Sequence, residues 1–136
     1  MNLQRHHQGP AAFGLRDNCI YLALDGTMRR YAKTAEFFRS ANGNPELIDG
    51  RTLALHHVNG PHDVHYPVWE MHPDGDELLI LASGSLSVEL RGKGATPLPP
   101  QAAVIVPAGI WHRLIVQEPS VLIAITTRRN TVHEQG

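Results

Sequence analysis

The sequence contains a single cysteine, Cys19, among its 136 residues. One thiol excludes an internal disulfide framework and is typical of a protein from a reducing compartment. The residues around Cys19 do not indicate a catalytic thiol, so we interpret it as a partly buried structural residue. The chain also lacks a signal-type apolar segment at its N-terminus and any apolar run long enough to span a bilayer. We therefore expect a soluble, cytoplasmic protein without a membrane partner.

The sequence has no excess of basic residues either. Twelve Lys and Arg against thirteen Asp and Glu give a formal net charge of −1. This balance argues against nucleic acid as a partner, because binding to phosphates requires clustered positive charge. Nine histidines, in contrast, are many for a chain of this length, which favours metal binding or acid–base chemistry.

Short apolar runs alternate with turn-forming clusters from residue 51 onward, which is typical of an all-β sandwich or barrel. The strands that we expect cover residues 20–24, 52–58, 68–72, 77–83, 86–91, 103–106, 112–117 and 121–127. Ser83-Gly84-Ser85 and Glu118-Pro119 are among the predicted turns. A short helix is expected over 34–39, with Thr34 as its N-cap and a stop at Asn42 to Pro45.

These elements predict one domain with an irregular N-terminal arm and a loosely held tail. Residues 1–19 should form an irregular N-terminal arm, 20–127 a single β-barrel domain and 128–136 a tail. We expect His6 and His7 in the arm, and His133 in the tail, to be solvated and without a role.

The stretch from Trp69 to Gly84, WEMHPDGDELLILASG, carries the clearest chemical signal. In a strand, the alternation of side chains places Glu70 and His72 on the same face. A Pro-Asp-Gly-Asp turn then reverses the chain, and Glu77 opens the apolar run that follows. The two carboxylates and the imidazole can therefore converge within one hairpin.

A second histidine belongs with this group. Pro107-Ala108-Gly109 forms a turn that places His112 early in the next strand. The candidate ligands are then Glu70, His72, Glu77 and His112. Two nitrogen and two oxygen donors suit a divalent transition metal with open coordination positions. Buried carboxylates without a metal or a partner would be costly, so a metal site is the preferred interpretation.

These residues resemble the two motifs of the cupin superfamily. The first motif has the form G-x5-H-x-H-x3,4-E-x6-G, and here it reads Glu70-x-His72-x4-Glu77-x6-Gly84, with Val64 at the place of the leading Gly. The second motif, G-x5-P-x-G-x2-H-x3-N, reads Pro107-x-Gly109-x2-His112, with Gln101 and Val116 at the places of its first Gly and its Asn. The resemblance is strongest to small single-domain cupins of the cupin-2, RmlC-like type that carry a WE-x-HP-x-GDE core.

The resemblance implies an all-β jelly-roll barrel (the cupin double-stranded β-helix), here with a short N-terminal helix. By the same resemblance, His72, Glu77 and His112 match metal ligands, and Glu70 takes the place of a histidine ligand. A second carboxylate makes the site harder and favours Fe or Mn, with Zn and Ni left open. Cupins commonly pair through outer faces or swapped terminal strands, so a homodimer is also implied.

Several functions remain open at this point. A small-molecule metalloenzyme, first a dioxygenase-type oxidoreductase and second an isomerase or lyase, is the leading hypothesis. Without a metal, Glu70 could shuttle a proton with His72 or with His112. A barrel that binds a small ligand without turnover is the third hypothesis.

Side-chain alternation also predicts the surroundings of the site. His56 and His57 point to opposite faces, so at most one of them lies in the barrel interior. Arg113 alternates away from His112 and is a poor candidate for an anion anchor. Trp69 and Trp111 should pack on the outer face, and Phe37 and Phe38 should pack onto the sheet rather than form a ligand lid. Four apolar residues share faces with the ligands and predict a mostly apolar cavity for a weakly polar substrate: Leu79, Leu81, Leu114 and Val116.

Overall fold

A computed structural model of the chain describes residues 11–41 and 47–136. Its elements are β1 (Asn18–Leu22), β2 (Met28–Ala32), α1 (Ala35–Ala41), β3 (Arg51–Val58), the 3₁₀ helix η1 (Pro61–Val64), β4 (Trp69–Met71), β5 (Glu77–Leu90), β6 (Gly94–Leu98), β7 (Ala103–Val106), β8 (His112–Thr126) and β9 (Val132–Glu134). The predictions for His6, His7 and the helix stop at Asn42 to Pro45 fall outside the described residues.

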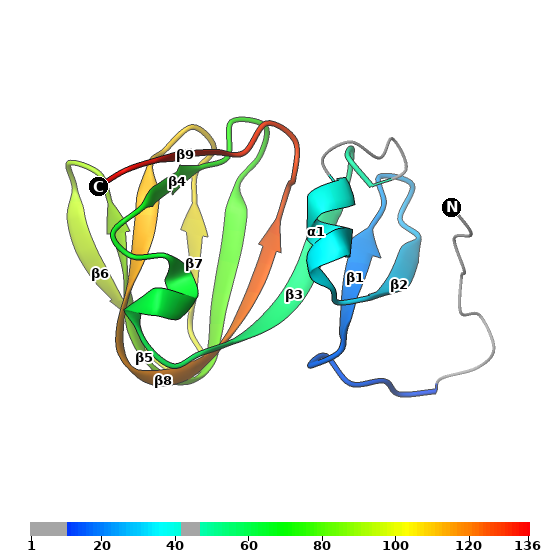
Figure 1. Ribbon diagram of the computed structural model, residues 1–136, viewed down its shortest axis with the longest axis horizontal. Helices are drawn as coiled ribbons and strands as arrows, with labels where there is room; N and C mark the ends of the chain where they lie inside the picture. The colour runs from blue at the N-terminus through cyan, green and yellow to red at the C-terminus, as the bar shows by residue number, and fades with distance from the viewer. Residues whose placement is uncertain (1–10, 42–46) are drawn as a thin grey trace.

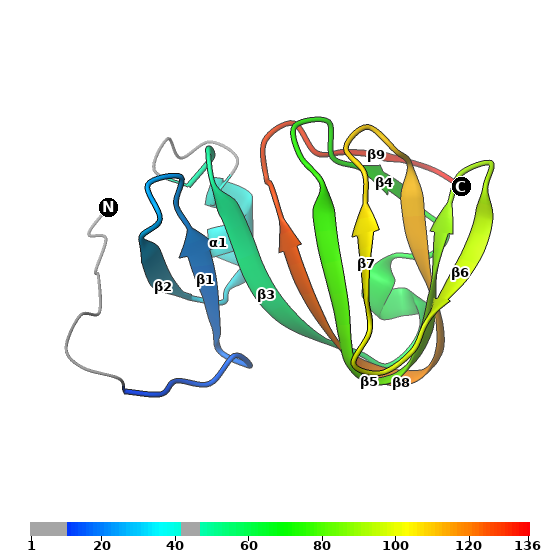
Figure 2. The ribbon, with the colours of Figure 1, turned by 180° about the vertical axis from the view of Figure 1, so that it is seen from behind.

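All strand pairs are antiparallel. One path of pairing runs β2-β1-β3-β8-β4-β9, and β5 adds pairs with β6, β7 and β8. The long strands β5 and β8 lie side by side and curve together, while β4 and β9 run across one end of the barrel (Figures 1 and 2). The expected all-β barrel with a short N-terminal helix is confirmed.

The barrel interior is filled by alternate side chains of its strands. Leu81 is fully buried, and Leu79, Leu86, Val88 and Val106 are nearly so. Burial of an aliphatic side chain of this size stabilises the folded state by about 1.5–3 kcal/mol. This cluster holds the long strands in register beneath the end that β4 and β9 cross.

A second, smaller core lies between α1 and strands β1 and β3. It contains Cys19, Tyr21, Phe37, Leu47 and Ala54. The thiol of Cys19 is completely buried, and burial raises its pKa to about 11 although nearby cations oppose this. Phe37 is thus confirmed as a packing residue rather than part of a lid.

The start of α1 follows the predicted capping pattern. The Phe37 amide donates to Thr34 Oγ1 at 3.0 Å, so Thr34 satisfies one of the free amides of the first turn. The helix ends at Ala41. Within the described residues, no helix combines the length and the apolar character that a bilayer span requires.

Two predicted turns are wrong, because both lie inside long bent strands. The Ser83-Gly84-Ser85 segment belongs to β5, and Glu118-Pro119 belongs to β8. The two segments face each other where the β5–β8 register shifts, which is the signature of a β-bulge. The Ser120 hydroxyl accepts from the Ser85 amide at 3.0 Å and donates to the Glu118 carbonyl at 2.8 Å, so the bulged backbone remains hydrogen-bonded.

Three strands are absent from the predicted set. β2 pairs with β1, which begins and ends two residues before the predicted 20–24 strand. β6 contains Pro97 and, among the described strands, pairs only with β5. Such an edge strand tolerates a residue that cannot donate a ladder hydrogen bond. β9 lies in the predicted loose tail, 128–136, and pairs with β4. The tail is therefore a structural part of the barrel end.

The bulge at Gly84 gives a test of this fold. Gly84 has φ +103°, and a Cβ there would lie 2.5 Å from Ser120 Cα and 2.6 Å from the Pro119 carbonyl oxygen. Backbone strain and overlap together should lower the free energy of unfolding of Gly84→Ala by about 3 kcal/mol. Gly92→Ala is the matched control, since Gly92 has φ +80° with nothing within 4 Å, and it should lose only about 1 kcal/mol. Urea unfolding measures both, and equal losses would contradict the bulge.

Candidate metal centre

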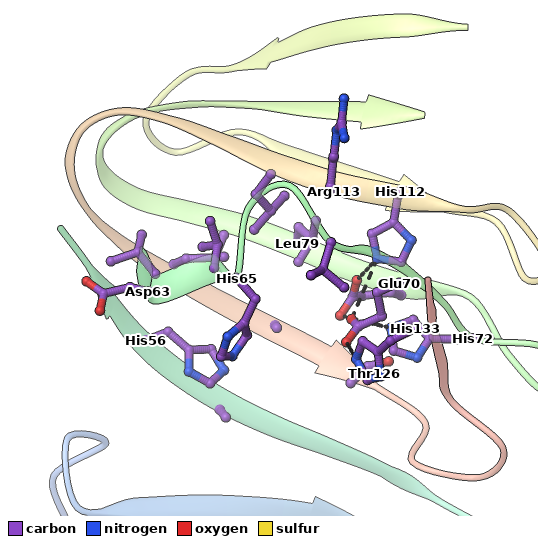
Figure 3. A pocket seen from close by; sticks show the side chains of 18 of the residues that line it. His56, Asp63, His65, Glu70, His72, Leu79, His112, Arg113, Thr126 and His133 are labelled. Carbon is purple, nitrogen blue, oxygen red and sulfur yellow. Dashed lines mark hydrogen bonds and ion pairs between the residues drawn. The ribbon is translucent and has the colours of Figure 1, made fainter. Parts of the chain in front are cut away.

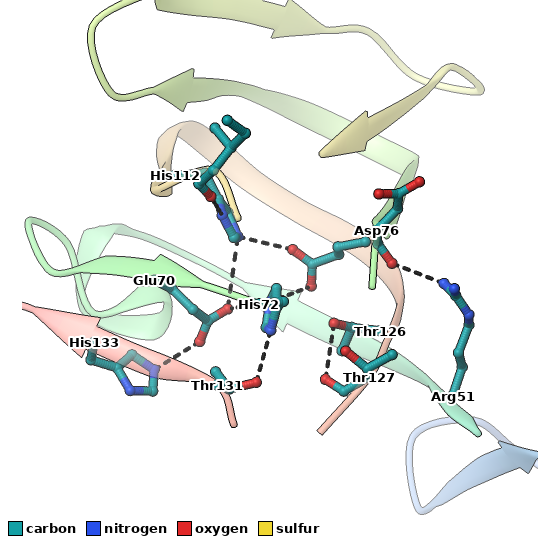
Figure 4. Close-up of polar contacts among 11 residues, drawn as sticks. Arg51, Glu70, His72, Asp76, His112, Thr126, Thr127, Thr131 and His133 are labelled. Atoms are coloured by element: carbon teal, nitrogen blue, oxygen red, sulfur yellow. Dashed lines mark hydrogen bonds and ion pairs between the residues drawn. The ribbon is translucent and has the colours of Figure 1, made fainter. Parts of the chain in front are cut away.

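The ends of three strands bring the four predicted ligands together. Glu70 of β4 lies directly opposite His112, the first residue of β8. His72 follows the end of β4, and Glu77 is the first residue of β5. Figure 4 shows the side chains of Glu70, His72 and His112 pointing toward one another. The convergence predicted from the hairpin and from the second motif is therefore present.

Hydrogen bonds between two turns hold the first motif against the second. The Asp76 carboxylate accepts from the Ala108 amide at 2.8 Å, and the Gly109 amide donates to the His72 carbonyl at 2.9 Å. Gly109 has φ +80°, a left-handed conformation that glycine adopts without strain. The Pro-x-Gly turn of the second motif thus holds the hairpin of the first one.

The distances between the donor atoms are those of a coordination shell. His72 Nε2 lies 3.0 Å from Glu70 Oε1 and 3.6 Å from Glu77 Oε2. His112 Nε2 lies 3.0 Å from Glu77 Oε1 and 3.8 Å from Glu70 Oε1. Donors about 2.1 Å from a transition metal ion lie about 3–4.2 Å apart in tetrahedral or octahedral geometry. All four residues offer atoms within 4.8 Å of one another, so the group can bind a metal.

The outer nitrogen of each histidine is already engaged. His112 Nδ1 lies 3.2 Å from the Ile110 carbonyl oxygen, which only accepts, so Nδ1 carries the proton and the Nε2 lone pair faces the cluster. His72 Nδ1 lies 2.8 Å from Thr131 Oγ1. Such outer hydrogen bonds orient imidazole ligands in metalloproteins. Thr131, between β8 and β9, was not predicted, because no local pattern connects it to a strand end 59 residues earlier.

Without a metal, the cluster forms a network of ion pairs. Burial disfavours the imidazolium of His72, but hydrogen bonds to Glu70 and Glu77 outweigh it and raise the His72 pKa to about 9. Burial likewise opposes ionisation of Glu70, but His72 and His133 lower its pKa to about 2. The pKa of the buried Glu77 is also lowered, because His112 and His72 outweigh desolvation. The carboxylates are therefore ionised at neutral pH, as metal binding requires.

His133 corrects the prediction of a solvated, inert tail. Its Nε2 lies 2.8 Å from Glu70 Oε2, the oxygen turned away from His72. The register of β9 on β4 places His133 directly opposite Glu70 (Figure 4). The exposed imidazole thus orients the most accessible of the four ligands, Glu70, whose side chain is 38% exposed. The only cue in the sequence was the short alternation around His133.

The cluster forms part of the wall of a cavity of about 330 Å³. Leu79 and Leu114 line it as predicted, whereas Leu81 and Val116 do not contact it. The predicted apolar cavity is wrong in part, because these polar residues also line it: Thr52, His56, Asp63, His65, Thr126 and Arg128. In Figure 3, His56, His65 and Asp63 lie across the cavity from the cluster.

The neighbouring residues follow the predicted alternation. His56 lines the cavity, whereas His57 is exposed on the outer face. Figure 3 shows the Arg113 side chain pointing away from the cluster, where it binds Glu89 at 2.7 Å. The Arg113 guanidinium also lies 3.9 Å from the centre of the Trp69 ring.

The two tryptophans pack outside the cavity. The Arg91 guanidinium lies 4.8 Å from the Trp69 ring centre and 4.9 Å from that of Trp111. Cation–π contacts of this kind stabilise the packing of Arg91 against the two tryptophan rings. Outer-face packing of both tryptophans is therefore confirmed within the described chain.

The chain is similar to several known proteins. No family model matches the chain. The chain is 36% identical over 75 residues to the curated "Uncharacterized protein YdbB" of Bacillus subtilis (strain 168), and the match spans 55% of this chain and 62% of that protein. A solved cupin-2 domain protein from Shewanella frigidimarina is 23% identical, with a TM-score of 0.48, over 57% of this chain and 70% of that one. A cupin-like protein from Thermotoga maritima is 19% identical, with a TM-score of 0.47, over 62% and 77%.

The similar solved structures are cupins. At these identities the likeness concerns the fold, and the argument for a metal rests on the donor atoms of this chain.

The ion pair between Glu70 and His72 predicts the pH dependence of the metal-free protein. The His72 pKa rises from 6.5 to about 9, so its stabilisation is complete below pH 6.5 and is lost as the pH rises through 9. The Glu70 pKa falls from 4.5 to about 2, so its stabilisation is complete above pH 4.5 and is lost as the pH falls through 2. The difference in unfolding free energy between wild type and Glu70→Gln should therefore be greatest between pH 4.5 and 6.5. Urea unfolding in EDTA measures it, and a difference independent of pH would contradict the ion pair.

The hydrogen bond from Thr131 to His72 gives a second test. Thr131→Val should weaken metal affinity about tenfold, because His72 loses the group that orients its ring. Competition with a chromogenic chelator measures this affinity. Thr127→Val is the matched control, since the buried Thr127 hydroxyl has no hydrogen-bond partner among the described residues. Equal affinities for the two variants would show that Thr131 has no such role.

Proposed function

We propose that this chain binds one divalent transition metal ion through Glu70, His72, Glu77 and His112 and acts as a metalloenzyme on a small molecule. The observation that supports it is the set of two imidazole nitrogens and two carboxylate oxygens converging within 4.8 Å on the wall of a cavity. Three of the four residues are buried, and an ion would compensate their charge. The cavity volume of about 330 Å³ suits a small molecule.

The donor set favours particular ions. Two carboxylates neutralise a divalent charge and form a harder site than three histidines and one glutamate. We therefore propose Fe or Mn, before Zn or Ni. Such an ion supplies Lewis-acid activation of a substrate oxygen and, when it is redox-active, electron transfer to or from dioxygen.

The chain's own residues account for the rest of the site. His112 and His72 direct Nε2 inward because their Nδ1 atoms are held by Ile110 and Thr131. Glu77 is 6% exposed and stays within the barrel wall. The more accessible Glu70 lies at the opening, where His133 orients it. A substrate in the cavity would therefore meet the cluster from the cavity side, which His133 of β9 also lines.

Within this proposal, a dioxygenase-type oxidoreductase is the first class and an isomerase or lyase the second. The two differ in whether the ion must be redox-active, so its identity separates them. A barrel that binds a small ligand without turnover uses the same cavity, and it would be recognised by saturable binding without product. Homodimer formation and a cytoplasmic location stay predictions.

A metal-free proton shuttle is the weaker alternative. Its candidate pairs are Glu70 with His72, in contact at 3.0 Å, and Glu70 with His112, at 3.8 Å. With the His72 pKa raised to about 9, however, the imidazolium keeps its proton at neutral pH, whereas an efficient acid–base group titrates near the working pH. The electrostatics thus disfavour a proton shuttle between Glu70 and His72.

Metal content tests the proposal directly. Elemental analysis of untagged protein should find about one ion of Fe, Mn, Ni or Zn per wild-type chain. His112→Ala and Glu70→Ala should lose most of it, because each removes one of four donors. His57→Ala is the matched control and should keep its metal, since His57 is an exposed histidine outside the cavity.

The outcome also separates the classes. A redox-active ion supports oxygen chemistry, and Zn supports the isomerase or lyase. Wild type that stays empty after all four ions have been supplied would refute the metal site. Equal loss from His57→Ala would show that the metal is bound elsewhere.

A further inference from the structure

Arg128 is an arginine in the cavity wall that was not predicted to have a role. It follows β8 by two residues and lines the same cavity as the cluster. Thr126, at the end of β8, lies near His72 in Figures 3 and 4. The backbone that leads to Arg128 therefore starts beside the cluster. The guanidinium carbon lies 4.5 Å from the centre of the Phe38 ring of α1. This stacking fixes the plane of the guanidinium against the cavity wall.

The polar contacts of the Arg128 guanidinium are incomplete within the described chain. Its Nε is buried without a hydrogen bond, and no described residue forms an ion pair with it. Arg113, which also borders the cavity, differs because Glu89 and the Pro67 carbonyl occupy its donors. Buried polar groups in folded proteins are nearly always hydrogen-bonded, so an unpartnered guanidinium nitrogen in a cavity wall requires an explanation.

A second unpartnered group lies at the same place. Thr52 is 1% exposed, lines the cavity, and its hydroxyl has no hydrogen-bond partner among the described residues. Thr52 pairs directly with Thr126 across β3 and β8, two residues before Arg128. A hydroxyl and a guanidinium therefore border one part of the cavity with unused donors.

The charged residues around the cavity also favour an anionic ligand. A divalent ion would cancel the charges of Glu70 and Glu77, and the cluster would then not compensate Arg128. His56 adds no positive charge, because burial, together with Lys33 and Arg128, lowers its pKa. Asp63 also lines the cavity, but its carboxylate accepts from the Asn59 amide at 2.8 Å and forms no ion pair with Arg128. The Arg128 guanidinium would thus keep an unpaired positive charge, which an anionic ligand would neutralise.

We propose that Arg128 and Thr52 bind the carboxylate of a small organic acid, which is the substrate class of the metal site. A guanidinium fork matches a carboxylate with two parallel hydrogen bonds, and the Thr52 hydroxyl adds a third donor. This inference rests on the proposed function, because the acid's second oxygen group is expected to face the cluster. Phe38 becomes a positioning residue that holds the guanidinium of Arg128.

Matched ligands test the anion site. Isothermal titration calorimetry compares malonate, succinate and glutarate with their monoamides on metal-loaded wild type. The monoamide keeps one carboxylate but replaces the other by an uncharged group of the same size. At least one diacid should bind about tenfold or more tightly than its monoamide, because the monoamide's one carboxylate can face either the metal or Arg128, and a charge-assisted contact is lost at the other end. Equal binding in all three pairs, or no binding of any diacid, would overturn the proposal.

Variants assign the preference to residues. Arg128→Gln should abolish the diacid preference while the metal content stays at the wild-type level. Arg129→Gln is the matched control, since its guanidinium pairs with Asp49 outside the cavity, and it should keep the preference. Thr52→Val, which is nearly isosteric, should reduce diacid affinity several-fold. A diacid preference that survives in Arg128→Gln would overturn the assignment.

The same titration on metal-free protein separates the two proposals. If wild type holds no metal, the proposed function fails, but the anion site is still tested with propionate. Propionate should then bind to wild type and should bind about tenfold more weakly to Arg128→Gln. Equal propionate affinity in the two metal-free proteins would refute the anion site on its own.

Discussion

The burial of charge at one end of an apolar barrel is the constraint on which this structure depends. Glu77, His72 and His112 lie beside a core of leucines and valines, where an isolated charge would be very costly. Contacts between Glu77 and the two histidines offset this cost, as do the hydrogen bonds of the two histidine Nδ1 atoms. A strand that crosses the barrel end covers the group. The position of β9, the turn at Gly109 and the pairing of Glu70 with His112 all serve this arrangement.

The cavity behind the cluster combines groups from distant parts of the chain. The barrel contributes the four donor side chains, whereas α1 contributes Phe38 and the segment after β8 contributes Arg128. Because Phe38 follows Phe37 of the second core, the packing of α1 also decides where the Arg128 guanidinium lies. The N-terminal elements are thus part of the site although they lie outside the barrel.

The parts of the site that local spacing determines could be predicted from the sequence. Alternation placed Glu70 and His72 on one face, and the two turns brought Glu77 and His112 to them. The contributions of Thr131 and His133 could not be predicted, because they depend on pairing between β4 and β9, over a separation of about 60 residues. The contribution of Arg128 depends on its contact with Phe38 of α1, 90 residues earlier in the chain. The segment around Gly84 was misinterpreted for another reason. Glycine and serine signal a turn and a bulge equally well, and only the partner strand decides between them.

The complete burial of Cys19 has a practical consequence. The chain has one cysteine, and its thiol lies in the core beneath α1 with a raised pKa, so the folded protein presents no reactive thiolate. A thiol reagent can modify Cys19 only when the packing of α1 on β1 opens. The rate of this modification therefore reports local opening of the N-terminal elements. A cysteine introduced elsewhere on the surface would carry a fluorophore or spin label selectively, without removal of the native residue.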